Sequence, residues 1–113
     1  MAKLSLRVDL SADSGRVGPG KITLLETVRE HKSISAAARQ LDMSYRRAWM
    51  LLDAMNQSFG TPVVATATGG KRGGGAELTP AGEQIVKHYR ELERAAQSAA
   101  SPHLKALQQL VGR

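Results

Sequence analysis

Two pairs of basic residues in this sequence have the type and the setting to bind a polyanion. Arg46 and Arg47 open a segment with helical periodicity, and Lys71 and Arg72 lie inside the run GGKRGGG at 69–75. An arginine on an exposed helix can donate two hydrogen bonds to O6 and N7 of guanine in the DNA major groove. Cations in a glycine-rich loop can follow a phosphate backbone or enter a minor groove. The alternative is that all four are solvated surface charges.

The distribution of charge favours the first interpretation. The chain has 113 residues, with 16 Lys and Arg against 10 Asp and Glu, so its net charge is +6. Residues 33–75 hold five basic and two acidic side chains, and no acidic residue lies between Asp53 and Glu77. An anionic polymer would therefore lie against this middle segment. Net charge alone does not establish such a partner, because many small basic proteins bind none.

Several classes of chemistry are excluded by residue type. The chain has no cysteine, which excludes a disulfide scaffold, a Cys-ligated zinc finger, an iron–sulfur site and a thiol nucleophile. His31, His88 and His103 are scattered without partners at metal-ligand spacing. The lysine of the glycine-rich run is followed by Arg72 and not by serine or threonine, so the run is no phosphate-binding P-loop. We expect no metal, cofactor, small-molecule site or enzymatic activity.

No segment is apolar and long enough to span a membrane, since the longest apolar runs are a few residues. Lys3 and Arg7 interrupt the N-terminal pattern, and no signal-peptide core follows them. We expect a cytoplasmic protein without a membrane partner.

The elements around Arg46 and Arg47 have the pattern of a helix-turn-helix, which we place over residues 35–58. Ser35, with Ser33 as a competing cap, precedes a short helix that ends at Leu41. Its three successive alanines would let the next helix pack closely at a steep angle. Ser44 caps that next helix, whose first residues are polar and basic. This is the arrangement of a recognition helix, whose N-terminal end enters the major groove.

Helical spacing assigns the two faces of the recognition helix. Its buried face is predicted to hold Tyr45, Ala48 or Trp49, Leu52, Met55 and Phe59. Its exposed face is predicted to hold Ser44, Arg46, Arg47 and Met50. Trp49 could stack on a base, but its place in the apolar pattern favours packing in the core.

The remaining segments complete a winged helix. Alternating apolar residues predict a strand over 3–10, and a first helix runs from Pro19 to about His31. Two strands around the glycine-rich loop predict a hairpin over 63–78, the wing. We therefore expect a mainly α fold with a small β-hairpin wing, a winged helix-turn-helix domain over residues 1–80.

A last helix follows the cap-and-proline pair Thr79-Pro80, and we assign residues 81–113 to dimerisation. It is predicted to run to about Ser98, with an interruption at Pro102 and a final short turn. Its predicted seam consists of Ile85, Tyr89, Leu92 and Ala96. The seam could pack within one chain, but a monomer would leave apolar surface uncovered. A homodimer would present two recognition helices to a palindromic site on double-stranded DNA.

The sequence GKITLLETVREHKSISAAARQLDMSYRRAW and the later TGGKRGGGAELTPAG resemble the N-terminal DNA-binding domain of ModE-type molybdate-responsive regulators. The pieces S-x-S-A-A-A-R-x-L and L-T-x-A-G are also similar to LysR-type regulators. The resemblance covers roughly residues 18–95. It implies a dimeric winged helix that binds a palindromic operator.

The resemblance and the helix pattern together define the candidate DNA contacts. For the recognition helix these are Ser44, Tyr45, Arg46, Arg47 and Met50. For the wing and the phosphate backbone they are Arg39, Gly69, Gly70, Lys71, Arg72, Gly73, Gly74 and Gly75. In the turn of the helix-turn-helix, Asp42 stands where such turns commonly have glycine, and aspartate tolerates the left-handed conformation that this position requires.

We expect a sequence-specific transcriptional regulator of the ModE-like type, linked to molybdate-related genes. Full-length regulators of this type carry C-terminal molybdate-binding domains, which have no counterpart before Arg113, so we expect that this chain does not sense molybdate by itself. Two alternatives stay open: an architectural protein that binds DNA without sequence preference, and a winged-helix module that binds other proteins.

Overall fold

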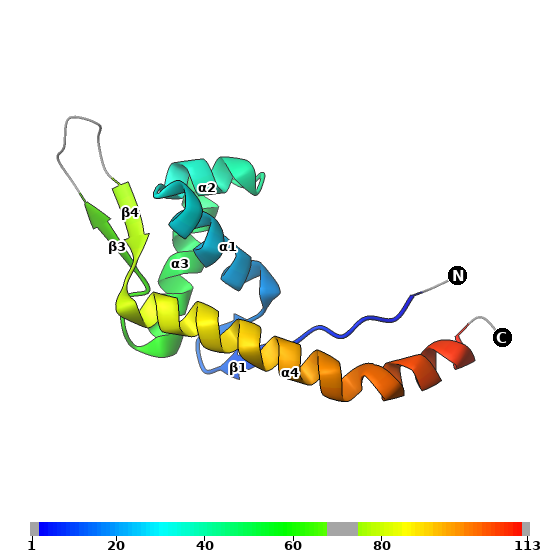
Figure 1. Cartoon of the computed structure of the whole chain (residues 1–113). Coiled ribbons are helices and arrows are strands. Elements are labelled where there is room, and N and C mark those ends of the chain that lie inside the picture. Colours follow the sequence, from blue (N-terminus) through cyan, green and yellow to red (C-terminus); the bar gives the residue numbers. More distant parts are fainter. Residues whose placement is uncertain (1–2, 68–74, 112–113) are drawn as a thin grey trace.

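In the computed structural model, which describes residues 3–67 and 75–111, a three-helix body carries a β-hairpin at one end and a long helix along one side (Figure 1). The elements in chain order are β1 (Leu10–Ala12), β2 (Gly15–Val17), α1 (Pro19–His31), α2 (Ile34–Gln40), α3 (Tyr45–Phe59), β3 (Val64–Ala67), β4 (Gly75–Leu78) and α4 (Pro80–Leu110). The predicted winged helix-turn-helix followed by a long C-terminal helix is confirmed.

The core lies where α1, α2 and α3 meet the start of α4. Fully buried side chains from α1 fill its centre, among them Ile22, Leu24 and Leu25. Helix α2 packs against α3, and the buried residues of α2 include Ala37 and Ala38. Small side chains let two helix backbones approach closely, so this pair forms the compact unit that the alanine run predicts.

Side-chain caps fix the starts of α2, α3 and α4, with Thr79 as the cap of α4. The hydroxyl oxygen of Ser33 accepts a hydrogen bond from the Ala36 amide at 3.0 Å, so Ser33 and not Ser35 caps α2. Ser44 caps α3 in the same way. Asp42, in the turn between the two helices, has φ of 57°, which is the left-handed conformation expected there. Removing such a cap typically costs about 1 kcal/mol.

The wing is an antiparallel hairpin in which Val64 pairs with Leu78 and Ala67 pairs with Gly75. Its base is joined to α4 through Thr79, whose amide donates to the Val63 carbonyl at 3.1 Å. The predicted wing over 63–78 is thus confirmed for its two strands. Its tip, residues 68–74, lies outside the described residues.

The start of α4 packs against this base without room for a side chain at Gly82. A Cβ at Gly82 would lie much closer to the Val63 carbonyl oxygen than van der Waals contact allows, and 3.3 Å from the Leu78 Cβ. Gly82 is buried. The glycine therefore lets the helix and the hairpin lie in direct backbone contact.

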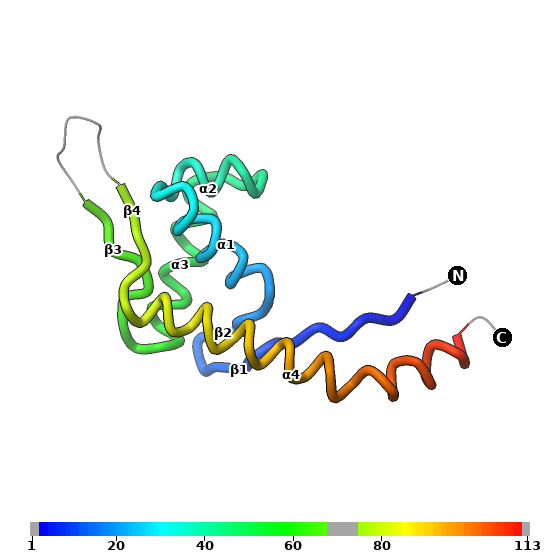
Figure 2. The backbone as a smooth tube through the Cα atoms, in the orientation of Figure 1, coloured from blue at the N-terminus to red at the C-terminus, as the bar shows by residue number. Residues whose placement is uncertain are grey.

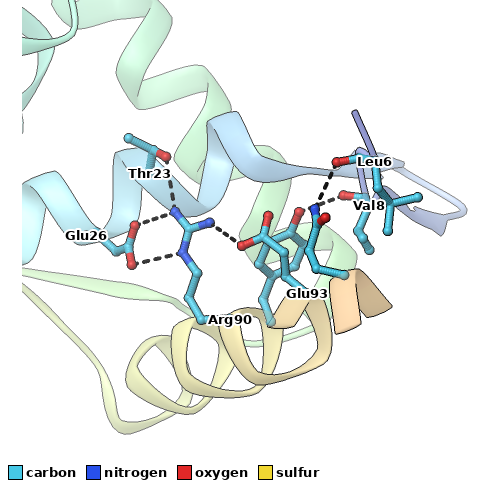
Figure 3. Close-up of polar contacts among 8 residues, drawn as sticks. Leu6, Val8, Thr23, Glu26, Arg90 and Glu93 are labelled. Atoms are coloured by element: carbon cyan, nitrogen blue, oxygen red, sulfur yellow. Dashed lines mark hydrogen bonds and ion pairs between the residues drawn. The ribbon is translucent and has the colours of Figure 1, made fainter. Parts of the chain in front are cut away.

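The predicted strand over 3–10 is wrong for most of its length. Only Leu10 belongs to a strand, the three-residue β1, and residues 3–9 are extended without strand pairing. Their backbone bonds side chains of α4 instead: the Tyr89 hydroxyl donates to the Val8 carbonyl at 2.6 Å, and the Gln97 amide donates to the Leu6 carbonyl at 3.1 Å (Figure 3). The alternating pattern arises because one side of this segment faces α4. Figure 2 shows the segment running beside the second half of that helix.

The predicted interruption of the last helix at Pro102 is also wrong, since α4 continues through this residue to Leu110. A proline inside a helix removes the hydrogen bond to the carbonyl four residues earlier. That carbonyl belongs to Ser98, which is exposed, as is Pro102. Water can satisfy the carbonyl there, so the helix does not have to end.

Arg90 fixes α4 against α1 (Figure 3). Its guanidinium donates to both carboxylate oxygens of Glu26, at 2.6 and 3.1 Å, and to Glu93 at 2.9 Å. The hydrogen bonds to these two carboxylates raise the pKa of Arg90. A two-point contact of this kind sets the direction in which α4 leaves the body.

In the part of the chain that the structure describes, no helix has the length and apolar character needed to cross a membrane.

Candidate nucleic-acid interface

The side chains of helix α3 lie on four sides of its axis: one that faces the core, one opposite the core, and two flanks. Successive residues are rotated by roughly 100°, and the strip that faces the core consists of Ala48, Leu52 and Met55. Arg46 and Met50 lie on the side opposite this strip and are exposed. Arg47 lies between these two strips on one flank of α3. The exposed face was predicted correctly, since Ser44, Arg46, Arg47 and Met50 are all exposed.

On the opposite flank of α3 the prediction of burial is wrong for both aromatic residues. Tyr45 is 54% exposed and Trp49 is 50% exposed. The spacing of these two residues places them at the edge of the apolar strip, and Ala48 takes the central position against the core. Phe59, also predicted to be buried, is 38% exposed.

Tyr45 and Trp49 line a hollow of about 340 Å³ between α3, the start of α2 and the ends of β3 and β4 that lie farthest from α4. The hairpin side of this hollow is lined by Thr66, Ala67, Gly75 and Ala76. Gly75 is the one predicted wing glycine that the structure describes. Gly69, Gly70, Lys71, Arg72, Gly73 and Gly74 lie outside the described residues.

A second and larger hollow, of about 580 Å³, lies on the other flank of α3 and is basic. Arg47 shares its lining with Arg16 from β2 and Lys21 from α1. Among the described residues none of these three cations forms an ion pair. Arg7 and Asp9 also line it, but they pair with each other at 2.8 Å, which lowers the pKa of Asp9 and raises the pKa of Arg7.

Sequence reasoning missed Arg16 and Lys21. Both lie near Pro19, far from the recognition helix in the chain, and only the packing of β2 and α1 against α3 brings them beside Arg47. The one local signal was that basic residues flank the start of the first helix. The predicted contact Arg39 is exposed near the end of α2, and it is not among the residues that line either hollow.

The four residues of the predicted dimer seam differ in their exposure to solvent. Tyr89 is only 3% exposed and belongs to the chain's own core, so it is not available to a second chain. Ile85 and Ala96 are half-buried, and Leu92 is 44% exposed. Farther along α4, Leu107 and Leu110 are exposed on the part of the helix that extends past the body (Figure 1).

Among residues 3–67 and 75–111, no three His, Cys, Asp or Glu side chains are grouped closely enough to hold a metal ion.

Comparison with known proteins agrees with this geometry. Residues 20–83 match the family described as bacterial regulatory helix-turn-helix protein, lysR family. The chain is 42% identical to the molybdenum-pterin-binding protein MopB of Rhodobacter capsulatus over 88% of this chain and 37% of that protein. It is 36% identical to the molybdenum transport protein ModE of Azotobacter vinelandii over 99% of this chain and 40% of that protein. These matches confirm the predicted resemblance.

A third relative is the DNA-binding transcriptional dual regulator ModE of Escherichia coli, 38% identical over 85% of this chain and 35% of that protein. The chain thus spans about two fifths or less of the length of these relatives. Among solved structures, the CbnR_DBD–DNA complex is similar with a TM-score of 0.58 and 25% identity, covering 77% of this chain and 95% of that one. The H2O2-bound C206S mutant of Corynebacterium glutamicum OxyR is similar with a TM-score of 0.55 and 26% identity, covering 73% of this chain and 24% of that one.

Proposed function

Because the chain belongs to the lysR family of bacterial regulatory helix-turn-helix proteins, we propose that it is the sequence-specific DNA-binding part of a transcriptional regulator. The observation that carries this proposal is the exposed N-terminal end of α3, where Arg46 and Met50 point away from the core between two hollows. The family is one of regulators, which agrees with the expectation of no enzymatic activity.

In this proposal α3 lies in the major groove and the two flanks of α3 face the two walls of the groove. Arg46 donates to base edges, since it lies on the outermost strip. Arg47 lies beside Arg16 and Lys21, where a phosphate backbone would meet three cations that form no ion pair with any described residue. Ser44 has a capping role. The wing cations Lys71 and Arg72, together with Arg39, would hold phosphates farther along the duplex.

We further propose that the protein acts as a homodimer on a palindromic operator in the cytoplasm. Support comes from the exposed leucines of α4, Leu92, Leu107 and Leu110, on a helix that extends past its own body. A two-fold pair would place two copies of α3 about one helical turn of DNA apart. Since relatives are named for molybdenum transport and molybdenum-pterin binding, genes of molybdenum handling are the first targets to search.

Selection of bound duplexes from a randomised library at physiological salt tests this function. We expect a palindrome whose half-sites lie about one turn apart. Salt-sensitive binding with no enriched sequence would replace the proposal by an architectural DNA-binding role. Failure to bind any duplex would leave a winged-helix module that binds other proteins.

The role of the basic hollow is tested by the double substitution Arg16→Ala plus Lys21→Ala. Each lost phosphate contact reduces the slope of log K against log salt by roughly one, so the slope should fall by about two for specific and unrelated duplexes alike. The measurement is a salt titration of DNA affinity.

A matched control removes the same charge elsewhere, with Lys87→Ala plus Lys105→Ala on α4. Both lysines are exposed and neither lines a hollow beside α3. The control should keep the parent slope. Equal slopes for the parent and for the Arg16–Lys21 variant would exclude the basic hollow from the interface.

A further inference from the structure

The two exposed aromatic side chains of α3 are not explained by the packing of the chain. Half of the surface of Trp49 and of Tyr45 is in contact with solvent. Exposed aromatic rings are costly in water, because burying such a ring removes a large apolar area from solvent. Their position on the same helix as Arg46, four residues apart, places them within the proposed DNA interface.

The hollow beside these rings has the shape of a recess at the edge of that interface. Ile34 from α2 and Ala67 and Ala76 from the hairpin contribute apolar atoms to its wall. None of the charged side chains described in the structure lines it. Ser33, Ser35 and Thr66 also line the hollow. An occupant that meets the two rings themselves is best matched by an apolar group, in contrast to the basic hollow on the other flank.

In the major groove of DNA the apolar group is the 5-methyl of thymine, since the other base-edge features are hydrogen-bond donors and acceptors. We propose that Trp49, with Tyr45, recognises thymine through this methyl group and so determines part of the operator sequence. The inference rests on the proposed function and deepens it. Four helical residues rise about 6 Å, close to two base-pair steps of about 3.4 Å each. The two rings therefore fit thymines one or two steps apart on the strand nearest the wing.

Replacing thymine by deoxyuridine tests this contact, because the change removes only the methyl group and keeps every hydrogen bond. Each thymine of a selected half-site is replaced in turn, and the dissociation constant is measured. At one or two positions the parent should lose about fourfold in affinity, the expected effect of one buried methyl-sized group. The Trp49→Ala variant should bind the thymine and uracil duplexes equally at the position that Trp49 contacts.

Two further variants make the result specific. Trp49→Phe keeps an aromatic ring and should retain discrimination against uracil. Phe59→Ala removes another half-exposed aromatic residue of α3, at the opposite end of the helix, and should discriminate as the parent does.

The outcomes separate this inference from the function on which it rests. Sequence-selective binding could persist while no deoxyuridine substitution changes the affinity, or while each changes it equally in the parent and in Trp49→Ala. Either result would show that thymine recognition by Trp49 is wrong, and the proposed function would stand. A Trp49→Ala variant that weakens every duplex by the same factor and keeps the uracil effect would indicate a contact with the sugar backbone instead. Absence of binding to any duplex would overturn both.

Discussion

Replacing Arg46 by alanine should weaken binding to the preferred duplex by about 1–3 kcal/mol and relax the preference at one base pair. Arg46 lies on the strip of α3 opposite Ala48, Leu52 and Met55, so its guanidinium is the group best placed to meet base edges. A two-bond contact with guanine is lost as a unit when the side chain is truncated. Binding to an unrelated duplex should change less.

Arg47→Ala should also weaken specific binding by about 1–3 kcal/mol, with a smaller change in base preference. Arg47 lies on the flank beside Arg16 and Lys21, where phosphate contact is proposed. The measurement is the dissociation constant of each variant for the selected duplex, for single-base variants of it and for a scrambled duplex.

Arg94→Ala on α4 removes the same charge from an exposed position away from α3, and serves as the control for net charge. If Arg46→Ala and Arg47→Ala bound selected and scrambled DNA as the parent does, α3 would not be the recognition helix.

Substituting alanine for Gly82 should destabilise the whole domain, by about 1–3 kcal/mol or more. The added methyl group would enter the space held by the Val63 carbonyl oxygen. That oxygen belongs to the backbone at the base of the wing and accepts a hydrogen bond from the Thr79 amide. It cannot rotate away as a side chain could, so the helix and the hairpin have to separate. Urea or thermal unfolding followed by circular dichroism measures the loss.

Gly20→Ala is a matched control near the start of another helix. A Cβ at Gly20 meets no heavy atom within 4 Å, and alanine is favoured over glycine in helices by up to about 1 kcal/mol. This variant should be as stable as the parent or slightly more stable. If the free energy of unfolding of Gly82→Ala matched that of the parent, the start of α4 would not be in tight contact with the backbone at the base of the hairpin.

The parts of the fold that were predictable from the sequence depend on neighbouring residues. Ser44 and the Thr79-Pro80 pair mark helix starts because a cap bonds an amide two or three residues ahead. Asp42 marks the turn for a similarly local reason. The family resemblance and the fold class follow from these same short segments, which is why they were confirmed together.

The parts that were not predictable depend on contacts between distant segments. The alternation of apolar and polar residues over 3–9 is the same whether the segment packs against a strand or against the side of α4. The exposure of Trp49 depends on which of the neighbouring residues Ala48 and Trp49 faces the core, and Ala48 does so. Arg16 and Lys21 join the candidate interface only through tertiary packing. Whether the recognition-helix and wing residues contact DNA stays a prediction.

The bonds between residues 4–8 and α4 have a consequence for biosynthesis. The Leu4 amide donates to Gln108, 104 positions later in the chain, and the Val8 carbonyl accepts from Tyr89, 81 positions later. A ribosome releases residues 4–8 well before these partners. The three helices of the body have local contacts and can assemble during translation, whereas the first residues stay undocked until α4 has emerged. Residues 4–8 are thus synthesised long before they can dock.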